Sequence, residues 1–114
     1  MITQSDLSQF TGTDHYYKYM FGAVLTDGVK FLCDGGYYWL ADLIMSWQAE
    51  IKNRHGLQPF QVWTLKKKES GWIARCEDGN NNYLASQEIE YSDSVLDVVE
   101  VWLIDNVMLL PSEY

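Results

Sequence analysis

The clearest pattern in the chain is a stripe of apolar side chains between residues 36 and 53. It comprises five residues at alternating spacings of three and four: Tyr37, Leu40, Ile44, Trp47 and Ile51. This spacing is typical of one face of an α-helix with about 3.6 residues per turn, and Asp42, Ser46 and Asn53 fall on the other side. The pattern predicts a long helix over about residues 36–53 that packs its stripe against a sheet.

The second half of the chain changes to alternating apolar and polar residues. Turn signals divide it into five expected strands between about residues 60 and 110: FQVWTLKK, WIARCE, YLASQEIEY, VVEVWLI and VMLL. Asp105-Asn106 suits the two positive φ values of a type I′ hairpin. The third strand is expected to bury one alternate face, made of Tyr83, Ala85, Gln87, Ile89 and Tyr91. The sequence therefore predicts an α+β fold in which helices pack on one face of a five-stranded antiparallel meander.

The segment before the long helix gives weaker signals. Thr26 is a suitable N-cap for a short helix over about residues 27–33, which Gly35-Gly36 separates from the long helix. Residues 14–25 are rich in aromatic side chains without a clear period. Strand and helix therefore both stay open there, with extended structure favoured at the start.

Length and composition indicate one globular domain over residues 1–114. Hydrophobic residues make up 47% of the chain, more than a disordered chain carries. No apolar run approaches the roughly 20 residues needed to cross a bilayer, and the first residues, MITQSDLSQF, lack the features of a secretory signal. We therefore expect a cytoplasmic protein that does not enter a membrane, with Cys33 and Cys76 as reduced core thiols.

The formal net charge of −8 is concentrated toward the C-terminus. Residues 1–68 hold six acidic and seven basic side chains, whereas residues 69–114 hold ten acidic side chains against Arg75 alone. This split argues against direct binding of nucleic acid through the C-terminal part and favours a basic partner. An acidic face is predicted from Glu88, Glu90, Asp93, Asp97 and Glu100. It is either a solvated surface or an imitation of nucleic-acid charge.

No constellation of side chains predicts catalysis. Asp34-Gly35-Gly36 lacks the Lys-Ser/Thr of a phosphate loop, and the two histidines and two cysteines do not have a zinc-ligand spacing. Cys33 and His15 are a conceivable nucleophile and base, but Asp34 and the end of a helix would raise the thiol pKa. We predict no catalytic, cofactor-binding or metal-binding residues.

Large aromatic rings gather between residues 16 and 39 in a number that one small core cannot bury fully. They are Tyr16, Tyr17, Tyr19, Phe21, Tyr37, Tyr38 and Trp39. A core filled by some of them, with ordinary surface tyrosines, is one interpretation. The other is a protein interface made of Tyr16, Tyr17, Tyr19, Tyr38 and Trp39. Because an aromatic patch beside a helix suits a two-fold contact, a homodimer is expected.

Several motifs follow one another along most of the chain: FTGTDHYYKY, LTDGVKFL, GGYYWLADLIMSWQ, FQVW, CEDGN, QEIEY and LLPSEY. Spanning about Phe10 to Tyr114, they resemble a family of small bacterial proteins of unknown function that also occur on plasmids and phages. The chain departs from that family where Asp93-Ser94-Val95-Leu96 replaces Asp-Phe-Pro-Leu and where Asp105-Asn106 replaces Asp-Gly. The resemblance implies a bacterial or mobile-element origin and brings no established activity, cofactor or catalytic residue.

These features together favour a non-catalytic accessory protein that acts by binding another protein. Two alternatives stay open. One is an acidic inhibitor that occupies the nucleic-acid site of a host defence nuclease. The other is a small-molecule binder or enzyme with a tyrosine-lined cleft between helix and sheet.

Overall fold

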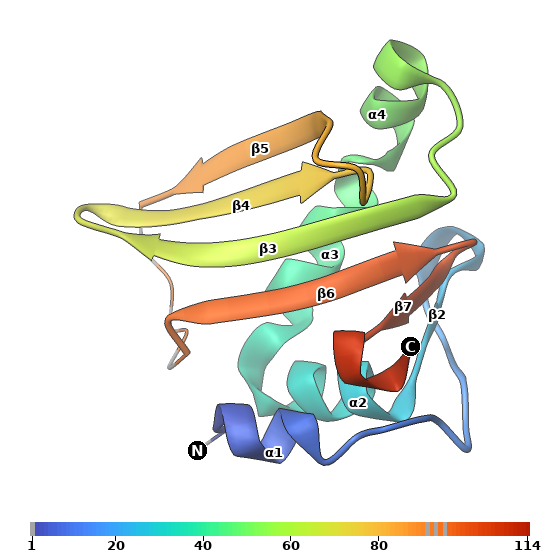
Figure 1. The fold of residues 1–114 in the computed structure, drawn as a ribbon, viewed down its shortest axis with the longest axis vertical. Helices are drawn as coiled ribbons and strands as arrows, with labels where there is room; N and C mark the ends of the chain where they lie inside the picture. Colours follow the sequence, from blue (N-terminus) through green and yellow to red (C-terminus); the bar gives the residue numbers. More distant parts are fainter. Residues whose placement is uncertain (1, 91, 93, 95) are drawn as a thin grey trace.

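The computed structural model describes every residue except Met1, Tyr91, Asp93 and Val95. The strands are β1 (Tyr17–Lys18), β2 (Val24–Leu25), β3 (Phe60–Lys68), β4 (Gly71–Glu77), β5 (Tyr83–Ile89), β6 (Val98–Ile104) and β7 (Val107–Leu109). The described residues join them into one seven-stranded sheet with the order β1-β2-β7-β6-β3-β4-β5 (Figure 1). With its helices, the chain has the predicted α+β class.

The helices are α1 (Gln4–Ser8), α2 (Asp27–Leu32), α3 (Tyr38–Ser46) and α4 (Gln48–His55), with a π-helical segment η2 (Cys33–Tyr37) and short 3-10 segments η1 (Met20–Gly22) and η3 (Pro111–Glu113). α3 and α4 are separated by Trp47 alone and form the predicted long helical stretch. Its Leu40, Ile44 and Ile51 are buried, and Figure 1 shows α3 crossing behind the sheet. No described helix is long and apolar enough to cross a membrane.

The segment before α3 follows the predicted start and break. The Thr26 hydroxyl accepts a hydrogen bond from the Val29 amide (3.4 Å) and caps the first turn of α2. Gly36 has a φ of 109°, which a residue with a Cβ atom rarely adopts, and this conformation interrupts the helical path before α3. β1 and β2 show that residues 14–25 contain short strands rather than a long helix.

The strand pairing corrects the predicted five-stranded meander. β6 pairs with β3 rather than β5, so it lies between β7 and β3. β2 pairs in parallel with β7 through Val24 and Val107, which makes the sheet mixed. Alternation of apolar and polar residues predicts where a strand lies but not which distant strand it joins. β1 and β2 are too short for alternation to be visible.

The buried face of β5 also differs in part from the predicted one. Cys76 pairs with Ala85 but Glu77 pairs with Tyr83, so Leu84 is the extra residue of a β-bulge. Leu84 is therefore buried, while Tyr83 is 51% exposed. An extra residue reverses the alternation, and the sequence pattern does not show where it falls. Of the other residues predicted for the buried face of this strand, Ala85 is buried, Ile89 is half-buried and Gln87 is exposed, while Tyr91 lies outside the described residues.

The β6–β7 turn has the predicted type I′ form. Asp105 and Asn106 have φ values of 47° and 68°, and both residue types tolerate this left-handed region. The Asp105 amide donates a hydrogen bond to the Pro59 carbonyl (2.9 Å). This bond joins the turn to the loop before β3 and defines one end of the sheet.

Candidate functional site

A pocket of about 450 Å³ lies between α4 and that end of the sheet. Its size is within the range of about 300–1,000 Å³ that is usual for ligand pockets. α4, the loop before β3, β3 itself and the β6–β7 hairpin supply its lining residues: Gln48, Ile51, Lys52, Gly56, Leu57, Gln58, Pro59, Gln61, Leu103, Asp105 and Asn106. None of these is a tyrosine, so the predicted tyrosine-lined cleft does not correspond to this pocket.

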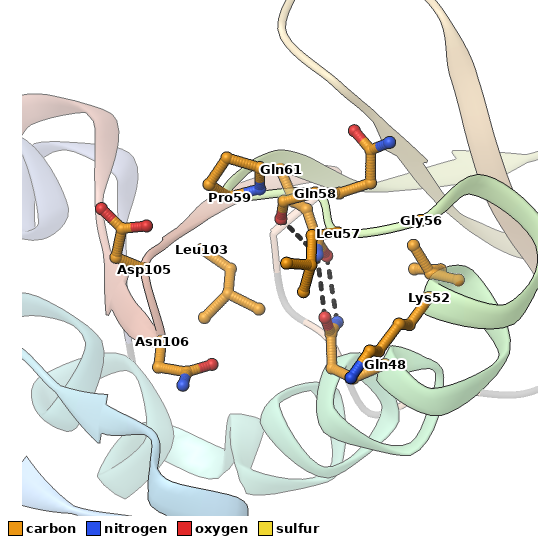
Figure 2. Close-up of a pocket in the computed structure, with 11 residues that line it drawn as sticks. Gln48, Lys52, Gly56, Leu57, Gln58, Pro59, Gln61, Leu103, Asp105 and Asn106 are labelled. Atoms are coloured by element: carbon orange, nitrogen blue, oxygen red, sulfur yellow. Dashed lines mark hydrogen bonds between the residues drawn. The ribbon is translucent and has the colours of Figure 1, made fainter.

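A pair of hydrogen-bonded glutamine side chains lines part of the pocket. The Gln48 amide donates to the Gln61 oxygen (3.0 Å), and the Gln61 amide donates to the Gln48 oxygen (2.8 Å), as Figure 2 shows. The Trp63 indole N–H also donates to the Gln61 oxygen (3.0 Å). Gln61 is buried, so these bonds satisfy a polar group that would otherwise destabilise the core. This part of the lining is therefore held by hydrogen bonds within the fold.

The rim of the pocket is more exposed. Figure 2 shows Lys52 and Asp105 on opposite sides of it, and neither forms an ion pair with a described residue. Leu57 also lines the pocket and is 80% exposed. The pocket thus combines apolar walls with an accessible entrance.

The turn between β1 and β2 lies beside the pocket. The Val24 amide donates to the carbonyl of Asn106, a lining residue (2.9 Å). At the tip, Phe21 and Gly22 have φ values of 56° and 78°, and the Ala23 amide donates to the Met20 carbonyl (3.1 Å). This is a type I′ turn with a phenylalanine at its first central position.

A second surface is formed by tyrosines of β1, the following turn and α3. We define the tyrosine surface as Tyr17, Tyr19, Tyr38 and Lys30. The Lys30 ammonium lies 5.6 Å from the centre of the Tyr17 ring and 6.0 Å from that of Tyr38, within the range of cation–π attraction. The Tyr19 and Tyr38 rings are stacked, with centroids 6.3 Å apart.

Carboxylates hold the hydroxyl groups of the tyrosine surface. Tyr17 donates to Asp27 (3.1 Å), Tyr38 donates to Asp34 (2.9 Å), and Tyr19 donates to Asp42. The bond to Asp27 raises the pKa of Tyr17, and burial, followed by the bond to Asp42, raises the pKa of Tyr19. Tyr17 and Tyr19 therefore stay protonated donors at neutral pH.

Lys30 completes the electrostatics of the tyrosine surface. Its ammonium lies 2.8 Å from Asp34, and this contact raises the pKa of Lys30 and lowers that of Asp34. The tyrosine surface thus carries three carboxylates, those of Asp27, Asp34 and Asp42, against the one lysine that pairs with Asp34, which leaves it acidic. Each of the three hydroxyl groups has a carboxylate acceptor.

The structure gathers part of the predicted aromatic interface. Tyr17, Tyr19 and Tyr38 meet on the tyrosine surface, and Tyr16 is 61% exposed near them in the chain. Trp39 is half-buried and lies against Tyr37, with ring centroids 6.4 Å apart. Whether a partner binds these residues stays a prediction.

The predicted acidic face is interrupted by bases. Glu88 on β5 pairs with Ile73, and Glu100 on β6 pairs with Thr64, so β3 and β4 lie between the two carboxylates. The intervening strands carry Lys66, Lys68 and Arg75. The Lys68 ammonium lies 2.5 Å from Glu88 and lowers the pKa of that carboxyl group. Of the other predicted members, Glu90 and Asp97 are exposed, and Asp93 lies outside the described residues.

Both cysteines are free and buried, as predicted. Burial, with a contribution from Asp34, raises the pKa of the Cys33 thiol to about 12, and burial raises that of Cys76 to about 12. Such thiols are poor nucleophiles at neutral pH. Among the described residues, no group of three His, Cys, Asp or Glu side chains is placed to hold a metal ion.

Three of the motifs quoted above meet at the start of α2. The Glu113 carboxylate accepts hydrogen bonds from the Thr26 hydroxyl (2.6 Å) and from the amides of Gly28 (3.0 Å) and Leu110 (2.9 Å). The Asp27 amide donates to the Thr13 hydroxyl (2.8 Å). These contacts join FTGTDHYYKY, LTDGVKFL and LLPSEY into one structural unit and supply caps for a short helix.

Sequence reasoning did not find the pocket or the role of Phe21. The pocket combines two separate stretches of the chain, residues 48–61 and 103–106, which share no motif, and its shape depends on β6 pairing with β3. The Phe21-Gly22 pair could have indicated this turn, because glycine is common at the second central position of a type I′ turn.

By fold and site, the molecule is a small α+β protein with a pocket between α4 and the sheet and with an aromatic, acidic surface. Over residues 1–114, the chain belongs to a family of unknown function, DUF6876. No curated protein and no solved structure shows a significant match to it.

Proposed function

We propose that this protein is a non-catalytic accessory module, of bacterial or mobile-element origin, which binds a partner protein through the tyrosine surface. The observation that supports it is that Tyr17 and Tyr38 lie against Lys30 and that Tyr19 stacks on Tyr38. Tyrosine is enriched where proteins bind one another because it offers a large apolar area together with a polar tip. Side chains that already form hydrogen bonds in the free protein lose less entropy on binding than unrestrained ones.

The charge of this surface favours a basic partner. Asp27, Asp34 and Asp42 accept the tyrosine hydroxyls, against one lysine. Arginine side chains stack on aromatic rings and pair with carboxylates at the same time. We therefore expect the partner to present arginines to this surface.

Site-specific photo-crosslinking in a bacterial lysate tests the proposal. A crosslinking residue in place of Tyr38 is expected to capture a partner that Tyr38→Glu no longer pulls down. Tyr83 is the matched control, because it is 51% exposed on the edge strand β5. A partner that binds Tyr38→Glu and wild type equally, or that crosslinks equally from position 83, would contradict the proposal.

Binding should also weaken as salt is added, because exposed charges are screened. The acidic-inhibitor alternative makes a similar prediction for a nuclease, but through Glu88 and Glu100. Replacing those two residues with glutamine separates the alternatives, since the tyrosine surface would be unchanged.

A further inference from the structure

Phe21 combines two features that the fold alone does not explain. Its φ of 56° lies in the left-handed region, which is disfavoured for a residue with a bulky side chain. Its side chain is 77% exposed, so little burial offsets that strain. Glycine or asparagine would form the same turn more easily. Backbone strain of this kind often marks a functional position.

The pocket lies at the same end of the sheet as this turn. Val24 pairs with Val107, which directly follows the β6–β7 turn, and its amide bonds to Asn106 in the pocket lining. The chain therefore has a projecting ring and a recess next to one another. Such a pair is self-complementary about a two-fold axis, where each copy offers the same patch to the other.

We infer that Phe21 of one copy inserts into the pocket of a second copy, and that the second copy's Phe21 inserts into the first. A cavity of about 150 Å³ is enough to hold a benzene ring, so a pocket of about 450 Å³ accommodates the Phe21 ring with room for Met20. Ile51, Leu57 and Leu103 provide apolar walls for it.

The area involved indicates a weak dimer. An aromatic side chain buries roughly 150–250 Å², so two rings and the walls they cover bury on the order of 600–1,000 Å². This is at the low end for specific association. We therefore expect a dimer that forms in the micromolar range.

This inference uses residues outside the tyrosine surface and does not depend on the proposed function. A partner lost with Tyr38→Glu and a dimer lost with Phe21→Gly are separate results. Either can fail while the other stands.

Sedimentation velocity over a range of micromolar concentrations tests the dimer with two variants. Phe21→Gly removes the ring and suits the positive φ. Leu57→Glu places a carboxylate at the pocket rim, where an entering ring would desolvate it. Each variant alone is expected to weaken self-association at least tenfold.

A mixture of the two variants provides the decisive measurement. Leu57→Glu keeps its Phe21, and Phe21→Gly keeps an open pocket, so the mixed pair retains one of the two insertions. The mixture should associate more strongly than either variant alone. Tyr83→Gly, which removes another exposed ring, should associate like wild type. A monomeric wild type at high micromolar concentration, an unchanged Phe21→Gly, or a mixture no stronger than its components would each overturn the inference.

Discussion

Phe21 combines a left-handed backbone conformation with a large, exposed side chain. Replacing it with glycine relieves a left-handed backbone that glycine adopts freely, while few contacts are lost. We expect Phe21→Gly to unfold, at concentrations where the protein is monomeric, with a free energy equal to that of wild type or up to about 1 kcal/mol higher. Chemical denaturation measures this directly.

Leu57→Gly is the matched control for that measurement. Leu57 is also an exposed loop residue but does not have a positive φ. Leu57→Gly should therefore lower the free energy of unfolding by roughly 0.5–1 kcal/mol, because glycine gives the unfolded chain more conformational entropy. If Phe21→Gly lowers the free energy of unfolding by more than this control does, the Phe21 ring stabilises the fold of the single chain.

The two buried thiols predict a loss of stability in alkali. Their pKa values rise from 9.0 to about 12 on folding, so below pH 9 both states hold the protons and no stability is lost. Between pH 9 and 12 the unfolded chain releases protons that the folded chain keeps. Stability should then fall by up to roughly 1.4 kcal/mol per pH unit for each thiol.

Unfolding free energies measured from pH 7 upward check this, with a Cys33→Ala/Cys76→Ala variant beside wild type. The variant should be less stable overall because it has cavities, but its alkaline slope should be shallower. Equal slopes would show that other groups, among them Tyr19 and Lys30, account for the dependence.

Among the elements, α2 depends on a residue from the far end of the chain. The Glu113 carboxylate accepts hydrogen bonds from three donors. Glu113→Gln keeps the shape of the side chain but replaces one carboxylate oxygen with an N–H₂ group, which faces one of these donors and cannot accept from it. We expect a loss of about 1–3 kcal/mol in the free energy of unfolding, because one donor is left without an acceptor. Glu90→Gln, at an exposed position, should change stability by less than about 0.5 kcal/mol. Similar values for both variants would contradict the cap.

Local features of the elements could be predicted from the sequence, and their partners could not. The Thr26 cap, the interruption at Gly36 and the turn at Asp105-Asn106 each depend on a few neighbouring residues, and all were predicted correctly. The position of β6 beside β3 and the bulge at Leu84 depend on contacts between distant segments. Local propensity contains no information about these contacts.

For the molecule as a whole, the candidate sites also divide into those made by neighbouring residues, which the sequence predicts, and those made by distant segments, which it does not. The grouping of Tyr17, Tyr19 and Tyr38 was predicted because these rings lie close together in the chain, and their use as an interface stays a prediction. The pocket was not predicted, because residues 48–61 and 103–106 come together only through the correct strand order. Likewise, the five predicted carboxylates were grouped by sequence, whereas the sheet places lysines and an arginine between two of them.

The net charge gives a final expectation that separates the two kinds of binding. Each copy carries −8, so two copies repel one another, and the inferred contact through Phe21 is apolar. Added salt shortens the Debye length to about 10 Å at 0.1 M and about 3 Å at 1 M, which screens that repulsion. Self-association should therefore strengthen as salt rises, whereas a basic partner on the tyrosine surface should bind more weakly. Sedimentation at low and high salt measures the first effect, with Phe21→Gly as the control that should stay monomeric at both. A wild-type dimer that dissociates as salt rises would show that ion pairs, rather than an inserted ring, hold it together.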